Sequence, residues 1–558
     1  MALASNNPDF IVIGSGSSGA VIAARLSEDP HANVLVLEAG RRERSIRLKM
    51  PIMFPVVMVD PKFNWSYMGE PEPFADNRLI RQPRGKALGG SSMINGMLYA
   101  RGHSRDFDEW RQLGNEGWSY DDVLPYFRKS ENHWGPADPW HGKGGPLSIK
   151  QQPKDNELYR RFIAATKALG YEERDSFHRA HADGSGQEGW GPPPLCIHEG
   201  TRASTAARFL IPAMDRPNLT VVTGALVTRI EVEGARAVAV HYRDADGRDH
   251  RVAANQEIIL SGGAYNSPQV LLLSGIGATD ELAEHGIPQV HHLPGVGRNL
   301  QDHPSVAMIL SAKREVTLTD SLRLDRAALA GLHWLFNHGG LISDMPVTAN
   351  GFIKTRPDLE RPDAQCLFQP TMIGAQLWAP GWRKPKPDVV AMACVLLRPE
   401  GRGWVRLRSA SPGDAPRILS NVLSTENDRA FFRRLIPQLR EIYRQPELAA
   451  VLTGEVFPGP QVQTDAEIDA WARTACNTAL HPVGTCAMGT GDMAVVDARL
   501  RVHGIAGLRV ADAAIMPRIV GGNTNAACIM IGEKAAAMIK ADNGLAEGLT
   551  SAAPAEAA

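Results

Sequence analysis

Three glycines near the N-terminus have the spacing of a loop that binds a dinucleotide phosphate. Gly14, Gly16 and Gly19 follow the apolar run Phe10–Ile13 and open an apolar helix. The first glycine permits a tight turn, the second lets the backbone approach a pyrophosphate, and the third lets the helix pack on the strand. The phosphate then lies at the positive end of the helix. We predict such a site here; the alternative is a glycine turn that binds nothing.

Residues further along the chain indicate which dinucleotide this loop binds. Glu38 ends a second apolar run about 20 residues after the loop, where a carboxylate accepts hydrogen bonds from an adenosine ribose. A second glycine-rich segment spans Arg84–Asn95, and Asp512 ends another apolar run, suited to a ribityl hydroxyl. NAD needs no second loop, whereas FAD has a ribityl chain and an isoalloxazine ring still to be held. We therefore predict FAD.

These residues require an α/β sheet to position them. Residues 10–110 and 215–310 alternate short apolar strands, glycine turns and amphipathic helices, which is typical of such a sheet. Residues 315–470 differ. There, Asp388–Leu397 and Val405–Arg408 are predicted to pair across a Pro-Glu-Gly-Arg-Gly turn.

A long helix is predicted to start at Thr425, whose hydroxyl is suited to capping its first turn. Pro437 should kink or break this helix, and Pro446 should end it.

The predicted fold class is α/β (α+β overall). It comprises an FAD-binding Rossmann-like domain assembled from discontinuous segments and a substrate domain with an antiparallel sheet and flanking helices. The expected boundaries are 8–155, 215–314 and 475–540 for the FAD-binding domain, 156–214 and 315–474 for the substrate-binding domain, and 541–558 for a disordered tail.

The composition of the chain argues against several classes of protein. The formal net charge of −1 argues against a nucleic-acid partner. The six cysteines form no CxxC pair and no zinc spacing, so we expect buried, reduced thiols and no metal. The N-terminus resembles no signal peptide, and no apolar run approaches the ~20 residues of a membrane span. We expect a cytoplasmic protein, with peripheral contact at the inner membrane left open.

Longer motifs carry a family resemblance. Residues 85–108 (GKALGGSSMINGMLYARGHSRDFD) and 263–277 (GAYNSPQVLLLSGIG) resemble the two signatures of the glucose–methanol–choline oxidoreductases. The similarity extends over about residues 8–540 and is closest to the bacterial choline-dehydrogenase-like branch. Its further segments are Leu293–His303, His481–Gly489 and Gly522–Ala526.

The resemblance implies how FAD is held. Many relatives attach the flavin through a histidine where this chain has Ile94, which offers no nucleophile, so the FAD should be non-covalent. The implied cofactor contacts, beyond the three glycines of the first loop, are Ser17, Ser18, Glu38, Gly90, Asn95, Gly96, Met97, Val227, Asp512, Ala513 and Thr524.

The resemblance also implies the catalytic pair. Oxidising an alcohol removes a proton from oxygen and a hydride from carbon, and the flavin accepts the hydride. The family pattern gives the base to His481 and the stabilisation of the oxygen to Asn523, with Asn525 as the nearest rival. An unperturbed imidazole has a pKa of ~6.5, so flavin reduction should rise with pH in that range. For His303 and the His291–His292 pair we expect structural roles in loops.

The substrate is less constrained by the sequence. Trp65 and Trp378 are candidate pocket walls, although ordinary core tryptophans fit equally well. Ser305 stands where choline-oxidising relatives carry an acid, and a buried trimethylammonium group without a carboxylate loses its counter-charge. A neutral primary alcohol is therefore preferred to choline. The expected electron acceptor is a quinone or another carrier; the alternatives are O₂, with production of H₂O₂, and a hydroxynitrile-lyase activity without net redox chemistry.

Overall fold

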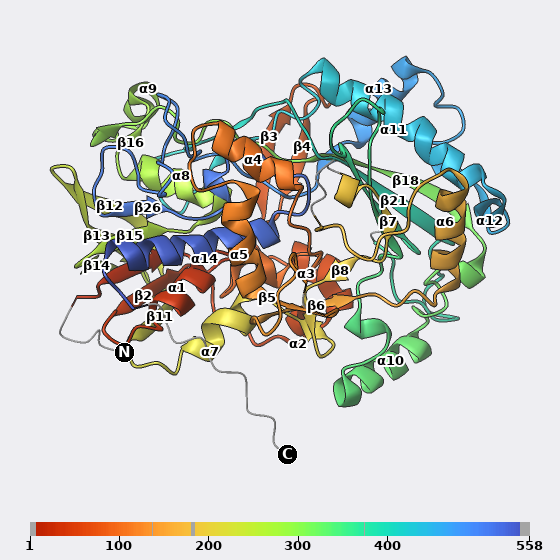
Figure 1. The fold of residues 1–558 in the computed structure, drawn as a ribbon, viewed down its shortest axis with the longest axis horizontal. Coiled ribbons are helices and arrows are strands. Elements are labelled where there is room, and N and C mark those ends of the chain that lie inside the picture. Colours follow the sequence, from red (N-terminus) through yellow and green to blue (C-terminus); the bar gives the residue numbers. More distant parts are fainter. Residues whose placement is uncertain (1–6, 137, 180–184, 373, 547–558) are drawn as a thin grey trace.

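The computed structural model describes residues 7–136, 138–179, 185–372 and 374–546 (Figure 1). Its first sheet has five parallel strands, and α14 (Asn525–Asp542) packs along α1 (Gly19–Leu26) beside it. In spatial order the strands are β11 (Leu219–Thr223), β2 (Val34–Glu38), β1 (Phe10–Ile13), β15 (Glu257–Leu260) and β26 (Leu508–Val510).

The sequence explains the centre of this sheet. Every residue of β1 and β2 is buried, as expected for parallel strands covered on both faces, and both read as continuous apolar runs that end at the cofactor loops. The strands come from three separate parts of the chain, so the predicted assembly from discontinuous segments is confirmed.

A second sheet lies to the right in Figure 1 and is antiparallel in all its pairs. Helices α6 (Glu157–Ala168), α11 (Glu426–Arg444) and α13 (Asp465–Ala475) flank it, which confirms the predicted class of the second domain. Its strands are β24 (Leu452–Phe457), β18 (Pro304–Ala312), β21 (Val389–Leu396), β20 (Ala364–Gln369), β19 (Ala349–Ile353) and β7 (Gly189–Gly191), with β25 (Asn477–Thr478) paired to β18.

The domain boundaries stay a prediction, but two strands bear on them. β18 and β25 belong to the antiparallel sheet although both were assigned to the FAD-binding domain. The segments that carry His303, just before β18, and His481, just after β25, are therefore joined directly to the antiparallel sheet, which we call the substrate sheet.

The predicted pairing of Asp388–Leu397 with Val405–Arg408 is wrong. β21 pairs with β18 and β20, whereas β22 (Trp404–Arg406) pairs with β23 (Arg417–Leu419). Between them, the Gly403 amide donates to the Leu300 carbonyl and the Val405 amide to the Gly297 carbonyl. These bonds turn the chain away from β21 before a hairpin can form.

Helix α11 begins as predicted, since the Thr425 hydroxyl accepts a hydrogen bond from the Asp428 amide. It is not broken at Pro437 and continues to Arg444, two residues before Pro446. Pro437 lies on the exposed side of the helix, while the opposite face packs into the core. Packing of that face outweighs one missing hydrogen bond.

The predicted disordered tail begins too early. α14 continues to Asp542, whose carboxylate pairs with Arg499, Arg501 and Arg509, and the Ala546 amide donates to Asp29. These contacts order residues 541–546, while residues 547–558 lie outside the described part of the chain.

All six cysteines are buried free thiols, as predicted. Within the described ranges, no helix is long and apolar enough to cross a bilayer, and no cluster of three metal-ligating side chains is found.

Candidate active site

One cavity of about 590 Å³ lies between the parallel sheet and the antiparallel sheet. Most of the predicted site residues line it: Gly14, Gly16, Ser17, Ser18, Glu38, Trp65, Gly90, Asn95, Gly96, Met97, Val227, Ser305, His481, Asp512, Ala513, Asn523 and Thr524. Gly19 and Trp378 are not among the described residues that line it. A side chain on Gly19 would clash with the Gly14 carbonyl, so this glycine serves helix packing. The Trp378 indole donates to the Thr319 carbonyl instead.

The two glycine-rich segments meet at the phosphate end of this cavity. Gly14 has φ +89°, a conformation that favours glycine, and a Cβ there would lie 2.5 Å from the Ser261 carbonyl oxygen. A Cβ on Gly90 would lie 2.8 Å from the Gly16 Cα, whereas one on Gly16 would meet nothing within 4 Å. The open side of Gly16 leaves room for a pyrophosphate against the backbone, so the loop fits the cofactor that the sequence predicts.

The two predicted cofactor carboxylates are held by neighbouring donors. Glu38 accepts hydrogen bonds from the amide and hydroxyl of Ser15 and from the Gly40 amide. Burial raises the pKa of Glu38, and these hydrogen bonds oppose that shift. Asp512 accepts from Ser267 and from the amides of Gly263 and Ala514. Both acids are thus fixed at the ends of parallel strands and face the cavity.

At the other end, His481 follows β25 in a strained turn. The preceding Leu480 has φ +65°, which is sparsely populated for a residue other than glycine, and its carbonyl accepts a hydrogen bond from Arg84. The His481 amide donates to Asp302 (2.8 Å), and its Nδ1 lies 3.0 Å from the Nδ1 of His303. Two distant segments, one with Arg84 and one with Asp302 and His303, therefore set the position of this imidazole.

The charge state of His481 follows from its surroundings. Burial, together with the positive charge of Arg84, lowers the pKa of His481 to about 3. Burial also lowers the pKa of His303 well below its usual value. Both rings are therefore neutral near pH 7, which differs from the expectation of an unperturbed imidazole, because burial removes hydration that would stabilise the cation.

The hydrogen bonds assign the tautomers. The Asn523 Nδ2 donates to the His481 Nε2 across 3.1 Å, so this nitrogen carries the lone pair. The proton of His481 is then on Nδ1, where His303 accepts it. The basic nitrogen of His481 faces Asn523 and the cavity.

The substrate sheet orients Asn523. The Gln365 Nε2, from β20, donates to the Asn523 Oδ1 (3.1 Å) and to the Asn350 Oδ1 (3.2 Å) on β19. Because the Asn523 oxygen accepts from Gln365, its amide nitrogen turns toward His481. Asn525 has a different partner, since its Oδ1 accepts from Ser17 in the phosphate loop.

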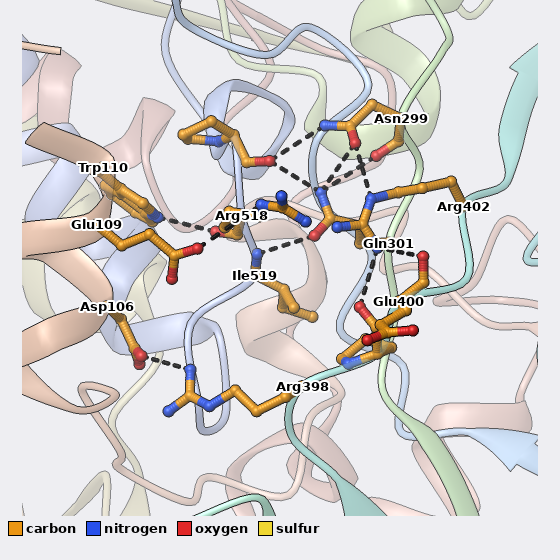
Figure 2. Close-up of polar contacts among 12 residues, drawn as sticks. Asp106, Glu109, Trp110, Asn299, Gln301, Arg398, Glu400, Arg402, Arg518 and Ile519 are labelled. Atoms are coloured by element: carbon orange, nitrogen blue, oxygen red, sulfur yellow. Dashed lines mark hydrogen bonds and ion pairs between the residues drawn. The ribbon is translucent and has the colours of Figure 1, made fainter. Parts of the chain in front are cut away.

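Figure 2 shows the contacts that hold the loop leading to Asn523. Gln301 donates to the Pro517 carbonyl and accepts from the Ile519 amide. Asp106 accepts from the Gly521 amide and pairs with Arg398 and Arg361. Although burial opposes ionisation, these two arginines keep the pKa of Asp106 at about 2. A permanent negative charge therefore anchors the loop two residues before Asn523.

Sequence reasoning missed part of this site. His303 was expected to have only a structural role in a loop, yet it contacts His481, and Gln365 and Asp302 were not singled out. Asp302 and His303 belong to the segment Leu293–His303, whose family resemblance was the available signal. Nothing local marked Gln365, which lies in a fully buried strand of mostly apolar residues.

Comparison with known proteins identifies the family. A family model described as GMC oxidoreductase matches residues 8–305, and its C-terminal counterpart matches residues 399–532. The chain belongs to the GMC oxidoreductase family. GMC oxidoreductases of this kind are FAD-dependent enzymes that act on the CH–OH group of alcohols, which confirms the predicted cofactor and enzyme class. At the position of covalent attachment, the side chain of Ile94 is buried and apolar.

Relatives of this GMC oxidoreductase include mitochondrial choline dehydrogenase of Mus musculus, 42% identical over 95% of the chain and 89% of the relative. Oxygen-dependent choline dehydrogenase of Escherichia coli O45:K1 is 43% identical over 96% of the chain and 95% of the relative. Among solved structures, pyridoxine 4-oxidase from Mesorbium loti is 31% identical with a TM-score of 0.84, covering 95% of the chain and 99% of that structure. Formate oxidase of Aspergillus oryzae is 27% identical with a TM-score of 0.89, covering 97% and 100%.

Proposed function

We propose that this enzyme oxidises a neutral primary alcohol to the aldehyde, with His481 as the base and Asn523 as the donor to the alcohol oxygen. The observation that carries the proposal is the pair of nitrogens, His481 Nε2 and Asn523 Nδ2, 3.1 Å apart at the cavity wall. One presents a lone pair and the other a proton, which are the two groups that alcohol oxidation requires of the protein.

FAD, when bound, would supply the acceptor for the hydride that leaves the alcohol carbon. The alcohol hydroxyl displaces Asn523 from His481 and donates its proton to the His481 Nε2. The Asn523 amide then donates to the oxygen as negative charge develops and the C=O bond forms. In the resulting imidazolium, the Nδ1–H of His481 still donates to the Nδ1 of His303, which stabilises the cation in a site that otherwise disfavours it. The residues of the first loop, Glu38 and Asp512 hold the cofactor.

The lining near His481 favours a neutral substrate. Ser305, Gln365 and Gln369 are uncharged, and the carboxylates among the described lining residues are Glu38, Asp414 and Asp512. Glu38 and Asp512 belong to the cofactor end, and Asp414 accepts from Ser409. Choline is the second candidate, because two relatives are named choline dehydrogenases and Trp65 stacks on Tyr67 in the cavity wall, where aromatic faces attract an ammonium group.

For the electron acceptor we propose a quinone or another carrier, with O₂ as the alternative. The relatives are named both dehydrogenases and oxidases, and the two classes share this fold.

An alcohol panel tests the proposal. Purified holoenzyme is mixed with aliphatic and aromatic primary alcohols and with choline, in the presence of an artificial acceptor or O₂ alone, and aldehyde and peroxide are quantified. We expect aldehyde from neutral alcohols and faster turnover with the artificial acceptor. If choline were the only alcohol in the panel that reduced the flavin, the proposed substrate class would be wrong. In that case Ser305→Glu should lower the KM for choline. Cleavage of a cyanohydrin without flavin reduction would indicate lyase activity.

A further inference from the structure

Helix α10 (Leu324–Asn337) presents an apolar face to solvent at the lower right edge of Figure 1. Leu329, Leu332 and Phe336 are 67%, 52% and 83% exposed, and Leu335 and Leu324 are also exposed. Their spacing places them on one side of the helix. Trp334 is the buried residue of this helix, and its indole donates to the Gly200 carbonyl. Trp334 thus anchors one side of the helix, and the leucines on the other side are exposed.

A basic hairpin adjoins the start of this helix. The Leu324 amide donates to the Trp378 carbonyl, and residues 379–383 form a tight turn whose Trp382 is 58% exposed. Arg383 lies over the Trp382 ring, and Lys384 and Lys386 follow, all exposed. None of the ion pairs within the described residues involves these three cations, whereas Arg323 and Arg326 of the helix pair with Asp325 and Asp320.

We propose that the apolar face of α10 and the basic hairpin 379–386 form a docking surface for a bilayer that contains anionic lipid. Exposed Leu and Phe on one helical face, an interfacial Trp and unpaired Lys and Arg are the features that bind the headgroup region. Each basic residue near an anionic surface adds about fivefold to binding. A second copy of this chain fits less well, because a two-fold interface on this face brings identical basic hairpins toward one another.

The docking surface is connected to the reaction cavity. The turn Leu341–Ser343 after α10 packs against the turn Pro51–Met53, and the Met345 that follows lines the cavity. Helix α3 (Phe54–Val59) directly follows Pro51–Met53. Its Phe54 and Met58 line the cavity, and its Val56 and Val59 are exposed. The segment that follows α10 is therefore continuous with the cavity wall through these short elements.

Vesicle flotation with the FAD-loaded full chain tests the docking surface. Vesicles of phosphatidylcholine with 0, 20 and 40% phosphatidylglycerol are mixed with the protein at low and at physiological salt. We expect the bound fraction to rise with phosphatidylglycerol and to fall with salt. No binding to the anionic vesicles at low salt would overturn the proposal.

Two variants and a control locate the contact. Leu332→Ser/Phe336→Ser should lower the partition coefficient at least tenfold at every lipid composition. Lys384→Glu/Lys386→Glu should lower it at least tenfold on anionic vesicles only. Met493→Ser removes an equally exposed apolar side chain elsewhere and should bind as the wild type.

Flavin absorbance and turnover of a water-soluble alcohol with an artificial acceptor should be unchanged in all three variants. This separates failure of docking from failure of the proposed function. Unchanged vesicle binding by both double variants would overturn the proposal. The proposal would also be overturned if light scattering showed a wild-type dimer that does not bind vesicles and the Leu332→Ser/Phe336→Ser variant were a monomer.

Discussion

The two ends of the cavity are built in different ways. At the phosphate end, the binding loop, its strand and Glu38 lie within the first 40 residues, and the hydrogen bonds of Glu38 come from Ser15 and Gly40. At the reaction end, His481 is held by Asp302, His303 and Asn523, and Asn523 in turn by Gln365. The loop and Glu38 are local in sequence, although Gly90 and Asn525 from distant segments contact the loop. The reaction end instead joins four distant segments.

This difference predicts how each end responds to substitution. A local loop is held by its own backbone, so a side-chain change there alters affinity for the cofactor and little else. The reaction end depends on a chain of side-chain hydrogen bonds, so a change in one residue alters the tautomer or orientation of the next. Substitutions at each end therefore test this difference.

The largest effect is expected for His481→Ala. Flavin reduction by alcohol should fall by about 10²–10⁴-fold, the usual contribution of a positioned base, while FAD stays bound because its predicted contacts lie elsewhere. Anaerobic stopped-flow absorbance isolates this step from the electron acceptor. The exposed His292→Ala is the matched control and should reduce its flavin normally. A His481→Ala enzyme that keeps FAD and the wild-type rate would exclude His481 as the base.

Asn523 and Asn525 lie two residues apart but belong to different ends of the cavity, so their variants distinguish the two ends. Asn523→Ala should slow flavin reduction by about 10–10²-fold, less than the loss of the base, because a donor to oxygen is removed while the proton acceptor remains. Asn525→Ala should weaken FAD binding and leave the reduction rate of the FAD-loaded enzyme intact, because its partner is Ser17. Stopped-flow reduction and flavin titration measure the two effects, and exchanged phenotypes would reverse our assignment.

Glu38→Ala tests the phosphate end. A hydrogen bond to a charged group contributes about 1.5–3 kcal/mol, so FAD affinity should fall about ten- to a hundredfold. Fluorescence titration of the apoprotein measures this affinity, and the rate of reduction at saturating FAD should be near that of the wild type. Glu233→Ala, at an exposed strand end, is the control. Unchanged affinity would make Glu38 a structural acid that only orders its own loop.

The smallest effect is expected in the pH profile. Because burial lowers the pKa of His481 to about 3, its imidazole is already neutral at pH 5, and the reduction rate should not rise between pH 7 and 9. Burial raises the pKa of Asp302 to about 6, so the rate should decrease as pH falls through 6 and this carboxylate gains a proton. Asp302→Asn should remove that limb. A wild-type limb near 7 that disappears in His481→Ala would show that His481 titrates normally.

The sequence by itself determined the cofactor and the family, and it indicated the residues of the proposed catalytic pair. Gly14, Gly16, Gly19 and Glu38 were recognisable because a phosphate loop needs only a strand, a turn and a helix that are adjacent in the chain. The discontinuous sheet was also predictable, since buried parallel strands form continuous apolar runs. Where reasoning used only local pattern, as at Asp388–Arg408 and Pro437, tertiary contacts overrode it.

Only the tertiary structure decided the relation of His303 to His481, the choice of Asn523 over Asn525 beside that ring, and the low pKa of the imidazole. A side-chain hydrogen bond between β20 and the C-terminal loop leaves no periodic signal in the sequence, because it joins Gln365 and Asn523, which lie 158 residues apart. Desolvation depends on every atom packed around a group and not on its neighbours in sequence. The chemistry of the reaction end is therefore set by the meeting of the two sheets.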